Sequence, residues 1–275
     1  MLLKGKKGII FGVLDENSIA WHVARRSVEE GAMLVLSNTE MALRLGKTDE
    51  LAQLINAPFI AADAVDAADI ENLLTETMKY FGGEIDFILH SIGMSPNVRK
   101  QKPYYDLDYS YFEKTLDVSA LSLHKILQSA WKLDALNTHA SVVALSYIAA
   151  QRTFSGYGDM AEAKALLESV VRSFGYHYGK RKKVRINSVS QAPTQTTAGS
   201  SVGGFANLYA FSDKMAPLGN PDASACADFC VTLFSDYTRG VSMQNLFHDG
   251  GYSSMGMGET LMDDIKNCIT GEKPL

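Results

Sequence analysis

Two phenols and one ammonium group occupy positions from which they could stabilise a developing negative charge. Tyr157 and Lys164 are seven residues apart at the start of a predicted helix. Because seven residues make close to two helical turns, both side chains are expected on one face of that helix. A positive charge beside a phenol favours the phenolate and helps the group to stabilise an oxyanion. Tyr147 lies ten residues upstream, so the sequence predicts a catalytic site of Tyr147, Tyr157 and Lys164.

An amphipathic helix with a buried tyrosine and a surface lysine is the alternative interpretation of this pair. The position of Tyr157 and Lys164 argues against that alternative, because their helix follows the fifth predicted strand. Tyr147 directly follows the same strand. In a parallel α/β sheet, ligands bind outside the carboxyl ends of the strands, where a nicotinamide is expected. The three groups should therefore converge beside that ring.

A second group of residues is placed to bind a dinucleotide. The turn from Gly12 to Ala20 joins the first predicted strand to the first helix, and a helix N-terminus at that place can hold a pyrophosphate. The turn has one glycine rather than three, and Ser18 is alternatively a simple helix cap. Gly93 follows the fourth strand in His-Ser-Ile-Gly, where glycine permits close approach to a ligand. Asp63 either meets an adenine or is an ordinary loop carboxylate.

The elements that position these residues alternate between strand and helix. The predicted strands are Gly8–Phe11, Met33–Ser37, Pro58–Ala61, Ile85–His90, Ala140–Ser146, Val184–Ser190 and Met243–His248. The predicted helices are Ser18–Glu30, Met41–Ile55, Ala67–Phe81, Tyr109–Leu133, Tyr157–Tyr178 and Pro221–Phe234. Such alternation favours a parallel sheet covered on both faces. The expected fold is a single doubly wound Rossmann-type α/β domain over residues 1–275, with a seven-stranded parallel sheet and a loop-rich stretch over 191–217.

Composition and charge agree with a globular enzyme. The 275 residues are 46% hydrophobic and 21% charged, and the formal net charge is −5. A negative chain is a poor general nucleic-acid binder. Three cysteines do not make a disulfide framework, and we find neither a signal peptide nor a membrane-spanning run. We therefore expect a cytoplasmic protein with no nucleic-acid partner and no membrane partner.

The chain resembles the NADH-dependent enoyl-[acyl-carrier-protein] reductases of bacterial type II fatty-acid synthesis, which are divergent short-chain dehydrogenases/reductases. The matching pieces, in the family's order, are Gly12 with Ser18-Ile19-Ala20, His90-Ser91-Ile92-Gly93, Leu145-Ser146-Tyr147, Tyr157 with Lys164, Arg185-Ile186-Asn187 and Asp249-Gly250-Gly251. The most specific pieces are the Tyr-x6-Lys spacing and the first loop with its single glycine. Ordinary members of the superfamily have Tyr-x3-Lys, a catalytic serine and three glycines in the first loop.

The resemblance implies an activity and a set of residue roles. The activity is reduction of the trans-2 double bond of an enoyl thioester on acyl carrier protein, the last step of the elongation cycle. Tyr157 would bind the thioester carbonyl, Lys164 the nicotinamide ribose, and Tyr147 and Ser95 the substrate. The other cofactor-binding residues would be Gly12, Ser18, Ile19, Thr39, Asp63, Ala64, Ser91, Ile92, Gly93, Pro193, Thr194, Gln195, Thr196, Thr197 and Ala198. A mobile segment at about 194–216 would bind substrate, and the protein would be a homotetramer.

Two departures from the family pattern concern the loop after the sixth strand. The family's Ala-Gly-Pro reads Gln191-Ala192-Pro193 here, and the added methyl group is tolerable only at negative φ. Relatives often carry several basic residues in the mobile segment, whereas Lys214 is the only basic residue in 199–215. We therefore expect Arg99, Lys100 and Lys102 to supply some of the positive charge that attracts the acidic carrier protein. The alternative is that these three residues belong to an ordinary solvated loop.

Other interpretations remain open from the sequence. A carbonyl or alcohol oxidoreductase on this fold would need Tyr-x3-Lys, but the residue four after Tyr157 is Ala161. A non-catalytic dinucleotide-binding regulator would be expected to lack Tyr157 or Lys164. NAD(H) is favoured because Glu40, an acid, lies near the end of the second strand. Alternatively Glu40 caps the following helix, and Arg44 would suit NADP(H). No metal is expected, since Cys226 and Cys230 read as small buried side chains.

Overall fold

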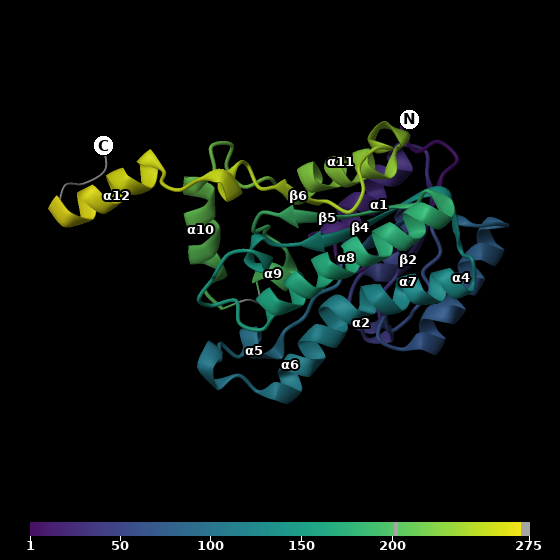
Figure 1. Cartoon of the computed structure of the whole chain (residues 1–275), viewed down its shortest axis with the longest axis horizontal. Helices are drawn as coiled ribbons and strands as arrows, with labels where there is room; N and C mark the ends of the chain where they lie inside the picture. The colour runs from purple at the N-terminus through teal and green to yellow at the C-terminus, as the bar shows by residue number, and fades with distance from the viewer. Residues whose placement is uncertain (201–202, 271–275) are drawn as a thin grey trace.

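The structure is a computed structural model that describes residues 1–200 and 203–270. A parallel β-sheet lies at its centre (Figure 1). Its strands are β1 (Lys7–Phe11), β2 (Met33–Ser37), β3 (Ile85–His90), β4 (Leu136–Ser146), β5 (Arg185–Gln191) and β6 (Asn245–His248). Within the described residues the sheet has six strands in the order β2-β1-β3-β4-β5-β6, and every neighbouring pair is parallel. The order reverses after β2, as expected of a sheet wound in two directions.

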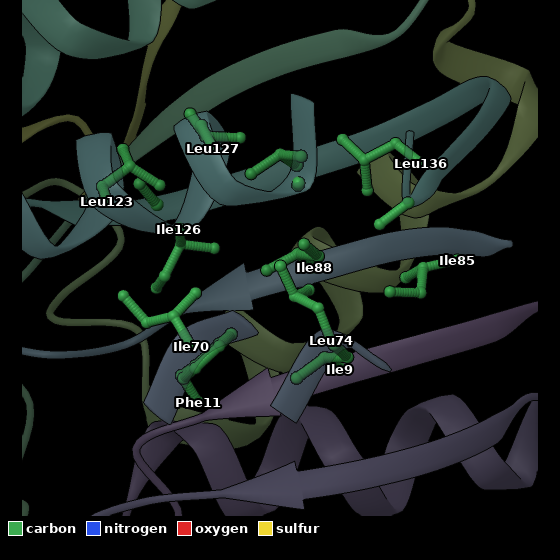
Figure 2. Close-up of a cluster of buried hydrophobic side chains, with 14 of the residues drawn as sticks. Ile9, Phe11, Ile70, Leu74, Ile85, Ile88, Leu123, Ile126, Leu127 and Leu136 are labelled. Atoms are coloured by element: carbon green, nitrogen blue, oxygen red, sulfur yellow. The ribbon is translucent and has the colours of Figure 1, made fainter. Parts of the chain in front are cut away.

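Helices cover both faces of the sheet (Figure 1). Helices α4 (Ala67–Phe81), α7 (Ser122–Lys132) and α8 (Met160–Lys182) lie on one face. Helices α1 (Ile19–Glu29), α3 (Thr48–Leu54) and α11 (Ala223–Phe234) lie on the other. Successive strand residues point to opposite faces, so Ile9 packs in the first core with Leu74 and Ile126 (Figure 2), whereas Ile10 packs in the second. The predicted Rossmann-like α/β fold with a parallel sheet is confirmed.

The predicted strand Pro58–Ala61, the third in chain order, is not one of the six strands of the sheet. Phe59 makes one parallel bridge to Leu36, with hydrogen bonds from Leu36 N to Pro58 O and from Ile60 N to Leu36 O, both 3.0 Å. The segment thus runs beside β2 at the predicted place. It is short and begins at a proline, which has no N–H to give to a ladder.

Three predicted helices differ in their bounds. The helix predicted over Met41–Ile55 is two helices, α2 (Glu40–Leu45) and α3, because Gly46 ends the first. The helix predicted over Tyr109–Leu133 is α6 (Tyr109–Leu116), a π turn η2 (Asp117–Leu121) and α7. Helix α8 begins at Met160, so Tyr157 precedes it. The reason is local: Tyr157 lies between two glycines, and Gly158 has a φ of +45°.

The structure also contains several helices that the sequence pattern does not predict. They are α5 (Pro96–Arg99), α9 (Thr197–Ser200), α10 (Phe205–Met215), α12 (Glu259–Thr270), and the short helices η1 (Tyr104–Asp106), η3 (Ile148–Ala150), η4 (Asp236–Thr238) and η5 (Tyr252–Ser254). Helices α9 and α10 lie in the stretch predicted to be loop-rich. Residues 201–202 of the segment expected to be mobile lie outside the described residues, and α12 extends beyond α10, away from the sheet (Figure 1).

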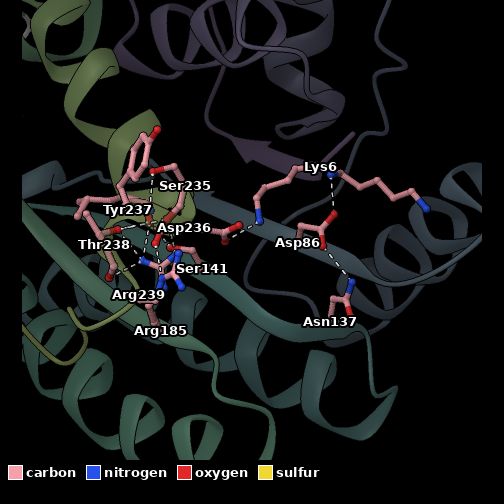
Figure 3. Close-up of polar contacts among 12 residues, drawn as sticks. Lys6, Asp86, Asn137, Ser141, Arg185, Ser235, Asp236, Tyr237, Thr238 and Arg239 are labelled. Atoms are coloured by element: carbon pink, nitrogen blue, oxygen red, sulfur yellow. Dashed lines mark hydrogen bonds and ion pairs between the residues drawn. The ribbon is translucent and has the colours of Figure 1, made fainter. Parts of the chain in front are cut away.

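Arg185 shows that part of the family pattern serves the fold. Its guanidinium is buried at the end of α11, where Nη1 donates to Leu233 O at 2.8 Å and Nη2 donates to Ser235 O at 3.0 Å (Figure 3). These carbonyl groups belong to the last turn of a helix and lack partners within it. Arg185 therefore joins β5 to α11 and holds the sheet's second layer in place.

No helix in residues 1–200 and 203–270 combines the length and the apolar character needed to cross a bilayer.

Candidate active site

A cavity of about 250 Å³ lies at the carboxyl ends of the strands, between the loops that follow β3, β4 and β5. The predicted site residues that line it are Ile19, Ser91, Ile92, Gly93, Ser95, Tyr147, Tyr157, Lys164, Pro193, Thr194 and Thr196. The structure thus brings the three groups singled out for chemistry to the same cavity as part of the predicted nucleotide site. Further lining residues include Ser146 and the apolar Leu145, Met160, Phe205 and Leu208, and the wall is largely apolar.

The remaining predicted cofactor residues do not line this cavity. Ser18 caps α1, because its Oγ accepts from Trp21 N at 3.3 Å, and Thr39 caps α2 in the same way. Asp63 is exposed, and its Oδ1 accepts from Val65 N at 3.1 Å, which is the loop-carboxylate arrangement. The others outside the cavity are Gly12, Ala64, Gln195 and Thr197, while the side chain of Ala198 lies outside the described residues.

Two glycines keep the first loop and the loop after β3 close together. Gly12 has a φ of +97°, and a Cβ there would lie 2.1 Å from Ser91 O. Such a contact is impossible for any other residue without moving the backbone. Gly93 is open on one side, but a Cβ would approach Met160 Cε at 3.0 Å and Lys164 Nζ at 3.7 Å. Gly93 lines the cavity, and the first loop of this fold binds a dinucleotide against its backbone.

Lys164 is buried on the first turns of α8, with 7% of its surface exposed. Its Nζ donates to Leu145 O at 2.7 Å. Burial lowers the pKa of Lys164 to about 8, and the negative charge of Glu168 opposes that change. Lys164 is therefore predominantly an ammonium at neutral pH, and an ammonium has three donors. One bond to Leu145 leaves two N–H groups for a ligand in the cavity.

Tyr157 and Tyr147 pack against each other at the cavity wall with their rings tilted, the centroids 5.0 Å apart and the interplanar angle 54°. Burial raises the pKa of both hydroxyl groups above that of free tyrosine. The expectation that Lys164 would favour a phenolate is therefore corrected: Tyr157 is a neutral phenol, because desolvation dominates. A neutral phenol donates a hydrogen bond. The Tyr147 hydroxyl is buried and has no hydrogen-bond partner among the described residues.

Asp159 is a buried carboxylate that the sequence reasoning missed. It is fully buried and accepts from Ser95 Oγ at 2.5 Å, Asn97 Nδ2 at 2.7 Å and Thr115 Oγ1 at 2.9 Å. Ser95 begins α5, which forms one cavity wall, and Asp159 follows Tyr157 by two residues. The cluster therefore ties the substrate-side wall to the loop that carries the phenol.

His90 and the π turn support the floor of the cavity. His90 Nε2 lies 2.8 Å from Ser122 Oγ. Burial and, secondarily, the charge of Lys164 lower the pKa of His90 to about 3, so the ring is neutral. In the π turn, Ser119 Oγ donates to Met94 O at 3.1 Å and accepts from Met94 N at 2.9 Å. Met94 lines the cavity, so the irregular turn positions a wall residue, as π bulges at functional sites often do.

A second cavity, of about 770 Å³, lies beside the first and shares Tyr157 and Leu208 with it. Its wall is rich in aromatic and methionine side chains: Phe154, Phe211, Met215, Tyr252 and Met255. Ring contacts continue from Tyr147 through Phe154 to Tyr252, at 5.2 and 6.5 Å between centroids. An apolar chain that passes Tyr157 would find room there.

The remaining sequence-based expectations concern three loops or helices. Ala192 has no positive φ, so the condition for its methyl group is met. Arg99 lines the first cavity, while Lys100 Nζ donates to Tyr111 Oη at 2.5 Å. Cys226 and Cys230 are buried in the core on α11, as predicted. A basic edge at α5 stays a prediction.

The fold and the site together define a dinucleotide-dependent oxidoreductase of the short-chain dehydrogenase type. A family model described as "Enoyl-(Acyl carrier protein) reductase" matches residues 12–253. The Rhizobium meliloti protein "Enoyl-[acyl-carrier-protein] reductase [NADH] 1" is 31% identical over 267 residues, which are 96% of this chain and 96% of that protein.

Solved structures of enoyl-(acyl carrier protein) reductases are similar to the structure of this chain. The crystal structure of the FabI-NADH complex from Alistipes finegoldii has a TM-score of 0.93 and 61% identity, covering 94% of this chain and 92% of that one. The Bacillus cereus enoyl-acyl carrier protein reductase with NADP+ and an indole naphthyridinone has a TM-score of 0.86 and 28% identity, covering 93% and 99%. This chain belongs to the enoyl-(acyl carrier protein) reductase family.

Proposed function

We propose that this chain reduces the trans-2 double bond of enoyl thioesters carried by acyl carrier protein, with NADH as the hydride donor. The reaction is the last step of the fatty-acid elongation cycle. The observation that carries the proposal is one cavity at the carboxyl end of the sheet that holds both the Tyr157 phenol and the Lys164 ammonium. Family membership and the NADH complex of the Alistipes finegoldii protein support it.

The residues act on the charge that the reaction creates. When bound, NADH would supply a hydride to C3 of the enoyl group; negative charge would gather on the thioester oxygen, and a proton taken up at C2 would complete the saturated thioester. The neutral Tyr157 phenol donates a hydrogen bond to that oxygen, and Lys164 adds positive charge while holding the nicotinamide ribose. The largely apolar wall strengthens both interactions, because fixed donors in a site of low dielectric act without solvent reorganisation.

The first loop and the strand ends hold the cofactor. In this proposal Gly12, Ser18 and Ile19 lie along the pyrophosphate, and Thr39, Asp63 and Ala64 lie around the adenosine. The nicotinamide is bounded by the loop after β3, Ser91 to Gly93, and by residues 193–198. The positive φ of Gly12 and the unpaired N–H groups at the start of α1 support the pyrophosphate position.

The substrate approaches from the α5 and α10 side. Tyr147 and Ser95 line its thioester end, and the acyl chain passes Tyr157 towards the second cavity, whose aromatic wall supports that path. The acyl carrier protein partner, the homotetramer, the cytoplasmic location, the single domain over residues 1–275 and a mobile segment at about 194–216 stay predictions.

A substrate comparison tests the proposed function. Oxidation of NADH is followed with trans-2-enoyl thioesters and, separately, with ketones and aldehydes. We expect turnover with the enoyl thioesters alone, and a lower KM for NADH than for NADPH. Tyr157→Phe is the control for turnover at this site. Reduction of ketones without reduction of enoyl thioesters would replace the proposal by a carbonyl oxidoreductase.

A further inference from the structure

Lys164 has a buried acidic neighbour one helical turn further along α8. Glu168 has 4% of its surface exposed and does not line the catalytic cavity. Residues four apart lie on the same face of a helix. A buried carboxylate is costly unless its charge and its lone pairs are used. The burial of Glu168 therefore requires hydrogen-bond partners for its carboxylate.

The two oxygens of the Glu168 carboxylate accept hydrogen bonds from the last residue of β4 and from the segment that follows it. Ser146 Oγ donates to Oε1 at 2.8 Å, and Gln151 Nε2 donates to Oε2 at 3.0 Å. Ser146 lines the catalytic cavity and directly precedes Tyr147. The preceding residue, Leu145, accepts the bond from Lys164. One turn of α8 thus holds two consecutive residues of β4, one through an ammonium and one through a carboxylate.

Glu168 is also the charged group whose field raises the pKa of Lys164. His90 lies near Lys164 at the end of β3, and Tyr147 after β4, Tyr157 before α8 and Arg99 of α5 line the same cavity as Lys164. His90 is neutral because burial lowers its pKa, and both tyrosines are neutral because burial raises theirs. They supply no negative charge to the ammonium near neutral pH.

We propose that Glu168 is a positioning residue of the reductase, whose two hydrogen bonds tie the part of α8 that carries Lys164 to the end of β4 that precedes Tyr147. The inference rests on the proposed function for its activity assay. Glu168 acts through Lys164 and Ser146, and it touches neither substrate nor cofactor.

Glu168→Gln tests the charge, because glutamine keeps the volume and an acceptor for Ser146. Loss of the Lys164 proton should lower kcat at alkaline pH. In Glu168→Gln we expect this fall to occur about one pH unit lower than in the unchanged protein. Activity at pH 6.5 should return close to that of the unchanged protein. Glu162→Gln, on the same helix, is the matched control. Glu162 is half-buried, accepts from Tyr104 Oη at 2.7 Å and should leave the profile unchanged. An unmoved alkaline limb in a folded Glu168→Gln protein would overturn the proposal.

Two further variants keep the test decisive. Glu168→Asp keeps the charge but shortens the reach, so its alkaline limb should stay in place while kcat falls. If Glu168→Gln does not fold, Ser146→Ala takes its place: kcat should fall at least about threefold with the alkaline limb unmoved. An unchanged kcat in Ser146→Ala would contradict the positioning role.

If the protein without substitutions reduces no enoyl thioester, the proposed function fails by itself. The pH dependence of NADH binding, measured by fluorescence, then tests Glu168 in the same variants.

Discussion

The Asp159 carboxylate accepts a 2.5 Å hydrogen bond from the hydroxyl group of Ser95, a residue 64 positions away in the chain. This contact joins the start of α5 to the loop before α8. Asp159 also holds Asn97 and Thr115, so three neutral donors converge on one fully buried carboxylate. The substrate-side wall and the Tyr157 loop therefore keep their relative positions through one side chain.

Asp159→Ala should lower stability and weaken substrate binding together. Ser95 Oγ loses its acceptor, whereas Thr115 Oγ1 keeps Tyr111 O and Asn97 Nδ2 keeps Asp108 O. An unsatisfied buried group costs about 1–3 kcal/mol, so we expect a loss of that size in the free energy of unfolding, with KM for the enoyl thioester rising more than the Kd for NADH. Urea unfolding and steady-state kinetics measure both. Asp66→Ala, which removes the cap of α4, should cost about 1 kcal/mol without changing KM.

Tyr157→Phe should remove the hydrogen-bond donor and keep the ring that packs on Tyr147. Loss of one donor to a developing oxyanion lowers kcat by about 10²–10³-fold, while the melting temperature should stay within a few degrees. Tyr147→Phe is the comparison, because its hydroxyl has no partner in the described chain. We expect that change to lower kcat less than about tenfold. A larger loss in Tyr147→Phe than in Tyr157→Phe would reverse the assigned roles.

Gly12→Ala should destabilise the protein more than an ordinary glycine replacement does. A Cβ at Gly12 meets Ser91 O at 2.1 Å, whereas at Gly82, which also has positive φ, nothing lies within 4 Å. Gly82→Ala should therefore cost about 1 kcal/mol of left-handed strain, and Gly12→Ala more than about 2 kcal/mol. NADH binding should weaken in Gly12→Ala alone. Thermal unfolding with and without NADH separates the two effects, and equal losses would show that the contact with Ser91 does not matter.

His90 should make the protein sensitive to acid. Its pKa is about 3 in the folded state, against an ordinary histidine value of 6.5. Between these values the unfolded chain binds a proton that the folded chain does not, so stability falls as pH falls from about 6.5 to about 3. His90→Gln should lose that part of the slope, roughly 3–5 kcal/mol over the interval. Urea unfolding at pH 7, 5.5 and 4.5 measures it, and parallel slopes in the two proteins would exclude His90 as a cause.

Much of the framework is predictable because apolar runs and helix caps are local signals. The predicted strands at β1, β2 and β3 agree with the observed bounds to within a residue, and Ser18 has the residue type of the cap that it forms. Tyr157 is predicted on a helix although Gly156 and Gly158 flank it, and those two glycines are the signal that a turn precedes α8. Helix α10 also has a signal, since Phe205, Leu208 and Met215 recur at helical spacing in a stretch predicted to be loop-rich.

The supporting residues of the site are beyond sequence reasoning for a physical reason. Lys164 and Glu168 look like a common surface pair at i and i+4, and only burial against Ser146 changes that interpretation. Asp159 resembles an ordinary helix cap, yet its side chain makes no cap bond and turns to Ser95 instead. Burial and partners of this kind depend on contacts between distant segments, which the order of residues along the chain does not state.

The position to which hydride is transferred tests the proposed reaction most directly. NADH that carries deuterium at the transferred position of its C4 is incubated with the protein and a trans-2-enoyl thioester, and the product is analysed by mass spectrometry and NMR. We expect one deuterium at C3 of the saturated thioester, with the rate greatly reduced in Tyr157→Phe. Deuterium at the thioester carbonyl carbon, or an equal rate in Tyr157→Phe, would contradict the proposed reaction.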